Sequence, residues 1–287
     1  MAQLFSVRIF ISVLLLLLPG AAFAGGGHQL PLYPESPFTE GSGLTWISNS
    51  MIMVWLAALI IVAFCRVATK KMALIPSGLQ NLAEWLVEGL YDFFGNILGE
   101  HLVKRTFWFF GATFLLILVV NYLGLIPGVG TMGTTDAHGH FKGLLRGGNA
   151  DLNMTAAMSI TFFLLWLYWS FTEIGVKNFF AHIFAPQGTF TGFMKVGMIV
   201  MFFLVGILEV VSIFIRPVAL SFRLFGNIYG GEQTLEGLMA LVPKYFAFLP
   251  ALPFYFMELL VGLVQALVFT LLCAVFLKLM CSHSEEH

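Results

Sequence analysis

The stretch SIFIRPVALSFRLFGNIYGGE, at residues 212–232, has the apolar composition of a membrane helix but carries charged side chains. Arg216 and Arg223 lie inside it, and it ends on Glu232. A charge at the centre of a membrane costs about 2.5–3.5 kcal/mol on insertion scales, so such charges pair, line water or face another protein. We therefore interpret the stretch as a functional membrane segment.

The whole chain has the composition of a multispanning membrane protein. Of its 287 residues 59% are hydrophobic and only 10% are charged, whereas soluble domains carry about 25% charged residues. The net charge of −1, without a basic tract, gives no reason to expect nucleic acid as a partner. The three cysteines have no CxxC spacing, which predicts neither a disulfide framework nor a zinc site.

The first 24 residues have the pattern of a secretory signal. Arg8 precedes the apolar run IFISVLLLLL, and the small residues AFA at 22–24 fit a cleavage site. We expect cleavage after Ala24, which would leave residues 25–287 as a single membrane domain with an exported N-terminal tail. An uncleaved anchor is the alternative.

Apolar runs predict an all-α integral membrane protein with about five membrane helices. The runs fall at residues 47–66, 106–126, 152–174, 196–215 and from 217 to the C-terminus. Residues 79–98 instead mix Leu, Trp and Phe with Glu84, Glu88 and Asp92 at helical spacing. We expect this segment to be an amphipathic helix that lies in the membrane interface.

Charge asymmetry orients the predicted spans. The exported tail carries no Lys or Arg. The connection between the first two spans carries five: Arg66, Lys70, Lys71, Lys104 and Arg105. By the positive-inside rule this connection is cytoplasmic. The mature N-terminus is then outside, and the C-terminus is cytoplasmic if the last region crosses once more.

Two short motifs resemble ligand sites but lack the context that such sites need. GVGTMG at residues 128–133 has GxGxxG spacing, yet it follows a predicted membrane span rather than a strand. His138 and His140 lack the further ligands that a metal site requires. We expect neither a cofactor nor a metal ion.

Polar residues within the last apolar regions fall on defined helix faces. They are Glu209, Arg216, Arg223, Asn227, Glu232, Glu236, Glu258 and Gln265. At 100° per residue Glu209, Arg216 and Arg223 share one face, and Asn227 lies one turn beyond. Glu232 lies on the opposite side, about 13 Å further along the axis.

This pattern predicts two separated polar paths with a cation between them. Intramembrane carboxylates are natural proton relays, whereas Arg223 does not usefully deprotonate and would act as a fixed electrostatic gate. Structural ion pairs, such as Glu209 with Arg216, are the alternative. Gly226 and Gly230 form a GxxxG face that would admit a partner helix, although packing within the chain is equally compatible with it.

These residues carry a family resemblance. RPVALSFRLFGNIYGGE, followed by MELLVGLVQALVFTLL, resembles subunit a of the F-type ATP synthase. NYLGLIP at 121–127, NADLNMT at 149–155 and GILEVVSIFIRPV at 206–218 fit the order of that family. The resemblance implies a non-catalytic stator of the rotary proton path in an energy-transducing membrane, most simply the bacterial inner membrane. It also implies two long, tilted helices near the C-terminus along a ring of c subunits.

The resemblance also assigns roles to residues. Arg223 would be the essential arginine, which attracts the deprotonated carboxylate of each passing c subunit and blocks a proton short circuit. The polar residues of the half-channels would be Glu209, Asn227, Glu232, Glu258 and Gln265, with Asp151 and Asn153 at the exported mouth. Contact with the c-ring would involve Leu224, Gly226 and Gly230. Further partners would be the b subunits and, through them, the F1 catalytic sector.

Both Glu232 and Glu258 are glutamates here, whereas relatives can have His or Gly at one of these positions. A relay assigned to a histidine in relatives must therefore be reconsidered. The main alternative function is a stand-alone proton-coupled secondary transporter, for which we would expect an internal repeat and a substrate pocket. A membrane-embedded hydrolase would need a motif such as HExxH, and neither that nor a P-loop occurs in the sequence.

Overall fold

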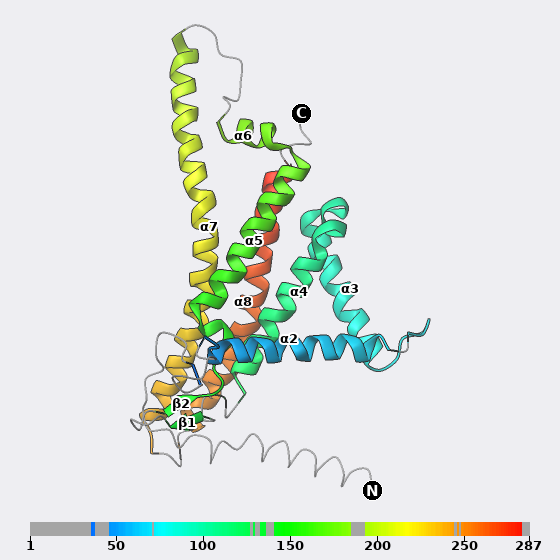
Figure 1. Cartoon of the computed structure of the whole chain (residues 1–287), viewed down its shortest axis with the longest axis vertical. Coiled ribbons are helices and arrows are strands. Elements are labelled where there is room, and N and C mark those ends of the chain that lie inside the picture. The colour runs from blue at the N-terminus through cyan, green and yellow to red at the C-terminus, as the bar shows by residue number, and fades with distance from the viewer. Residues whose placement is uncertain are drawn as a thin grey trace. The chain divides into compact units, whose positions relative to one another are not determined.

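The computed structural model describes residues 36–37, 46–70, 72–126, 129, 133–135, 141–184, 193–243, 246 and 248–282. Nearly all of these residues are helical (Figure 1). The predicted signal segment, residues 1–24, and the two histidines His138 and His140 lie outside the described residues.

Within the described ranges, five helices are long and apolar enough to cross a membrane, which confirms the predicted fold class. They are α2 (Asn49–Ala68), α4 (Glu100–Gly124), α5 (Leu152–Glu173), α7 (Phe193–Ala240) and α8 (Phe248–Ser282). A short helix α6 (Val176–Phe184) follows α5. Between α4 and α5 lie an antiparallel pair, β1 (Gly133–Thr135) and β2 (Phe141–Gly143), and the 3₁₀ turn η1 (Gly148–Ala150).

The apolar run 196–215 and the first part of the region from 217 form one helix, because α7 continues through Pro217 over 48 residues. In a bilayer, backbone groups freed by proline are satisfied within the protein, so an intramembrane proline does not have to end a helix. At 1.5 Å per residue α7 is about 72 Å long and the 35-residue α8 about 52 Å. Both exceed the roughly 30 Å hydrocarbon core, and their tilt along a ring stays a prediction.

The segment predicted to lie in the interface forms α3 (Leu79–Leu98). Glycines bound it at both ends, Gly78 with φ 60° and Gly99 with φ 83°, a left-handed conformation that glycine adopts without steric cost. Phe94 of α3 is buried and stacks on Phe110 of α4, with 5.4 Å between ring centroids. The exposed Trp85 lies on the other face. The position of α3 in the interface stays a prediction.

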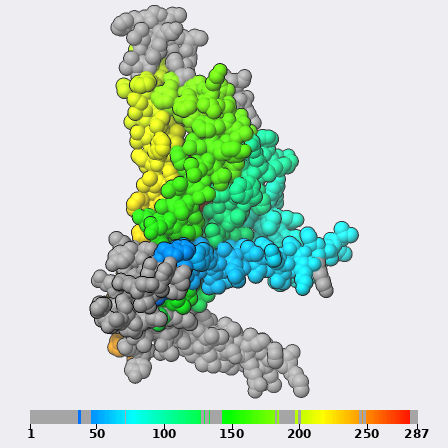
Figure 2. All heavy atoms as spheres, viewed as in Figure 1, coloured from blue at the N-terminus to red at the C-terminus, as the bar shows by residue number. Residues whose placement is uncertain are grey.

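The described residues form two compact units. One contains the described chain up to Val67, Leu115–Asp151 and Phe225–Ala266; the other contains Ala68–Phe114, Leu152–Leu224 and the chain from Leu267 onward. In the first unit, only 17% of the most apolar window of α2 is buried, and Figure 2 draws this helix in blue. Such a surface is suited to lipid or to other chains.

The core of the second unit is aromatic. Phe109 of α4 stacks on Phe162 of α5 at 6.3 Å between ring centroids, and Trp169 packs edge-on against Phe109. Trp166 donates from Nε1 to the backbone oxygen of Phe276 in α8 at 3.2 Å. The last of these contacts joins α5 to the part of α8 that carries Phe276.

Candidate functional site

Arg223 is exposed on α7, and no hydrogen bond or ion pair engages it among the described residues. Its neighbour Phe222 is 56% exposed, and Val218, just over one turn earlier, is 51% exposed. The surrounding surface of the helix is therefore apolar. Because an unpaired cation is costly in lipid, this surface must meet water or an anionic group from another chain.

Arg216 is placed differently, although it lies on the same helix. Its side chain is half-buried, and its guanidinium carbon lies 4.8 Å from the ring centroid of Phe276 on α8. Glu209, itself half-buried, interacts with Arg216 electrostatically. The described residues contain no direct ion pair between them. The chain thus supplies partners for Arg216 from within.

The structure brings Asn227 of α7 and Gln265 of α8 together. Asn227 donates from Nδ2 to the Oε1 of Gln265 at 2.8 Å, and Gln265 is buried. This bond joins two polar residues that the family resemblance assigned to the half-channels. It also fixes the register between the two helices in the first unit.

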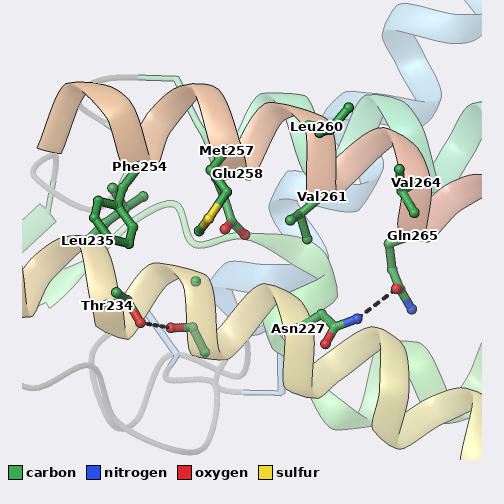
Figure 3. A pocket seen from close by; sticks show the side chains of 12 residues that line it. Asn227, Thr234, Leu235, Phe254, Met257, Glu258, Leu260, Val261, Val264 and Gln265 are labelled. Carbon is green, nitrogen blue, oxygen red and sulfur yellow. Dashed lines mark hydrogen bonds between the residues drawn. The ribbon is translucent and has the colours of Figure 1, made fainter.

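A pocket of about 390 Å³ lies between α7 and α8 beside this hydrogen bond (Figure 3). Its lining is mostly apolar, with four polar side chains: Asn227, Thr234, Glu258 and Gln265. The carboxylate of Glu258 points into the space between the helices (Figure 3), and its Oε1 is buried without a hydrogen-bond partner among the described residues. A methyl group at Gly231 would overlap this carboxylate, so the glycine makes room for it.

Glu232 lies near Glu258 and interacts with it electrostatically, as it does with Glu236 and Arg146. Its Oε2 is buried and has no hydrogen-bond partner in the described part of the chain. A carboxylate that is buried in this way is costly when charged unless a cation or water is near. The structure therefore groups Glu232, Glu258, Asn227 and Gln265 in one unit, and their roles in a proton path stay a prediction.

Two sets of hydrogen bonds hold the segment of residues 149–151. Ser50 of α2 donates to the Oδ2 of the buried Asp151 at 2.5 Å. Asn149 donates to the Oδ1 of Asn121 at 2.7 Å, and Asn121 donates to the backbone oxygen of Gly262 in α8 at 2.9 Å. The second set links the segment before α5 to α8, one turn from Glu258. Asn153, by contrast, is exposed on the first turn of α5.

The glycine face of α7 is open. A Cβ added at Gly226 or Gly230 would meet no atom within 4 Å among the described residues, and both positions are exposed. Packing within the described chain therefore does not explain this GxxxG spacing. Leu224 does not belong to the exposed face, because its side chain is fully buried. It turns inward since consecutive residues of a helix differ by 100° in direction.

Sequence reasoning missed four polar residues of this site: Ser50, Asn121, Arg146 and Asn149. Asn121 and Asn149 stand inside the motifs NYLGLIP and NADLNMT, so a signal was present. No sequence signal pointed to Arg146, because its importance depends on a contact with α7 that the local sequence does not encode. Across the described ranges, no group of three His, Cys, Asp or Glu side chains is arranged to hold a metal ion.

Comparisons with known proteins identify the family of this chain. Residues 51–278 match the family model for the ATP synthase A chain. A protein named ATP synthase subunit a from Trichlorobacter lovleyi is 33% identical, over 80% of this chain and 86% of that protein. The protein of the same name from Solidesulfovibrio magneticus is 32% identical, over 83% of this chain and 87% of that protein. The one from Aliarcobacter butzleri is 29% identical, over 86% of this chain and 94% of that protein. The chain therefore belongs to the ATP synthase A chain family.

Proposed function

We propose that the chain is the proton-channel subunit of the F0 sector of an ATP synthase, a non-catalytic stator. It carries protons through two half-channels to and from carboxylates on a ring of c subunits. The observation that carries this proposal is the placement of Arg223: exposed on a membrane helix, amid apolar side chains, without a partner in the described residues.

An exposed intramembrane cation requires an anion from outside the chain. Arginine keeps its proton, so Arg223 attracts a deprotonated carboxylate without relaying protons itself. A positive charge at that position also repels protons, which prevents direct passage from one half-channel to the other. The open glycines Gly226 and Gly230 follow Arg223 along α7 and allow a partner helix to approach closely.

The carboxylates of Glu232 and Glu258 supply relay sites. Both have a buried oxygen without a hydrogen-bond partner in the described residues, and Glu258 borders the pocket between α7 and α8. A pocket of this size admits several water molecules, through which a proton reaches and leaves the carboxylates. Asp151 and Asn153, with Glu209, are proposed as further polar positions of the half-channels.

The partners follow from this role. The c-subunit ring covers the face of α7 that carries Arg223, and the b subunits connect the chain to the catalytic F1 sector. We place the chain in the bacterial inner membrane, with the mature N-terminus outside and the C-terminus in the cytoplasm, as the positive-inside rule indicates. Residues 25–287 then form one membrane domain after the leader has been removed.

Liposomes test this function against the secondary-transporter alternative. Vesicles that contain the purified c-ring, this chain, or both are given a potassium diffusion potential, and proton uptake is followed with a pH-sensitive dye. We expect flux only when both components are present. Proton flux with this chain alone would favour a stand-alone transporter, and flux through the c-ring alone would remove the need for this chain.

A further inference from the structure

Arg146 is a buried arginine of the site, outside the set that the sequence predicted. It lies between β2 and η1, and only 4% of it is exposed. Its guanidinium carbon lies 5.8 Å from the ring centroid of Tyr229 on α7. Tyr229 and Glu232 are three residues apart, so they lie on the same side of that helix. The segment before η1 therefore reaches the part of α7 that carries Glu232.

Gly147 brings the backbone of this segment directly onto Glu232. A Cβ at Gly147 would overlap Glu232 Oε1. The backbone angles of Gly147, φ −50° and ψ 119°, suit any residue, so conformation alone does not require glycine here. Gly124 at the end of α4 is also close, since a Cβ there would lie 3.2 Å from the Cα of Gly147 and 3.9 Å from Glu232 Oε1. The space beside this carboxylate thus depends on residues that lack side chains.

The charges that act on Glu232 come from three elements. Glu236 on α7 and Glu258 on α8 are like charges, Tyr255 on α8 also interacts with Glu232, and Arg146 is the cation. Among the described residues, Arg146 is the positive charge that acts on this acidic group. Without it, three carboxylates would repel one another in a buried region, which is unfavourable.

We propose that Arg146 is a positioning residue for Glu232: it holds the carboxylate against Gly147 and balances its charge between Glu236 and Glu258. This rests on the proposed role of Glu232 in the proton path. The relay site is then controlled by a loop residue outside the membrane helices. Arg146 itself keeps its proton and acts only through Glu232.

A double-mutant cycle in the intact, reconstituted ATP synthase complex tests the proposal. ATP-driven proton pumping is measured for the normal chain, Arg146→Gln, Glu232→Gln and the double variant. We expect Arg146→Gln to slow pumping about tenfold in the normal chain, and by less than twofold once Glu232 is already Gln, because residues in contact are not additive. If Arg146→Gln slowed pumping by the same factor with Glu232 and with Gln at position 232, the proposal would be overturned. Arg146→Lys should restore most of the rate, since it returns the charge.

If the complex does not assemble with Arg146→Gln, the Gly147→Ala variant provides a second test. The added methyl displaces the Glu232 carboxylate without changing any charge, so pumping should slow in the normal chain but change little in the Glu232→Gln background. Gly237→Ala is the matched control, because its Cβ would meet no atom within 4 Å in the described structure. Unchanged pumping with Gly147→Ala would count against the contact.

The cycle separates this inference from the proposed function. If Glu232→Gln alone leaves pumping unchanged, the proton path through Glu232 is wrong, and the role of Arg146 falls with it. If Glu232→Gln slows pumping while Arg146→Gln has the same effect in both backgrounds, the path stands and only the positioning role is wrong.

Discussion

Arg216 and Arg223 are the same residue type, two turns apart on one face of α7, yet their surroundings differ. Arg216 is half-buried over the ring of Phe276 and interacts with Glu209. Arg223 is exposed, and none of the described residues forms a hydrogen bond or ion pair with it. A buried or membrane-embedded charge needs a partner. The comparison teaches that the chain itself supplies partners for one arginine, whereas the proposed partner of the other is a carboxylate of a second chain.

The largest effect is expected from Arg223→Ala. Without the cation, the rotor carboxylate has no counter-charge, so ATP-driven proton pumping should fall to the background of vesicles that lack the complex. The complex should still assemble, because Arg223 makes no ion pair or hydrogen bond within the described chain. Pumping is followed by fluorescence quenching in inverted vesicles, with subunit composition checked on gels. Coupled pumping by the variant would break the contrast between the two arginines.

Replacing the relay carboxylates should have a smaller effect. Glu258→Gln and Glu232→Gln each keep the side-chain shape but remove a site that takes up a proton. We expect each to slow proton flux on the order of 10²-fold, the lower end of what a positioned proton-transfer group contributes. Glu88→Gln is the matched control, since Glu88 is exposed on α3 in the other unit. Normal flux in the double variant Glu232→Gln, Glu258→Gln would remove both from the path.

The smallest effect is expected from Arg216→Met, which keeps much of the packing on Phe276 and removes the charge. Loss of the cation–π contact should destabilise the chain by about 1 kcal/mol, visible as a lower midpoint when the complex is heated in detergent. Proton pumping should persist. If Arg216→Met instead abolished pumping as Arg223→Ala does, the distinction between a structural and a functional arginine would be wrong.

Much of this arrangement could be predicted from the sequence, because hydropathy and the 3.6-residue period are local properties. They gave the membrane class, the amphipathic α3 and the common face of Arg216 and Arg223. The hydropathy pattern divides at Pro217, whereas α7 continues through it, since a bilayer leaves the backbone no alternative to the helix. Leu224 was assigned to the exposed face of α7, but it is buried, because the sequence does not show what α7 packs against.

The contact of Arg146 with α7 could not be predicted for a different reason. Tertiary proximity of residues far apart in the sequence depends on the path of the connecting segment, which in this chain includes β2 and η1. The bond between Asn227 and Gln265 was not predicted either, although both residues were singled out because they lie on periodic faces of long helices. The polar pair then identifies the register in which those faces meet.

A disulfide crosslink to the rotor tests most directly whether another chain covers the face that carries Arg223. A cysteine at Gly226, which is exposed and open, is paired with a cysteine next to the carboxylate of the c-subunit helix, after the exposed Cys65 has been replaced by serine. The buried Leu224→Cys is the matched control. We predict rapid oxidative crosslinking from position 226 and little from 224. Failure at 226, or equal yields from both positions, would contradict the proposal that Arg223 meets a carboxylate of the rotor.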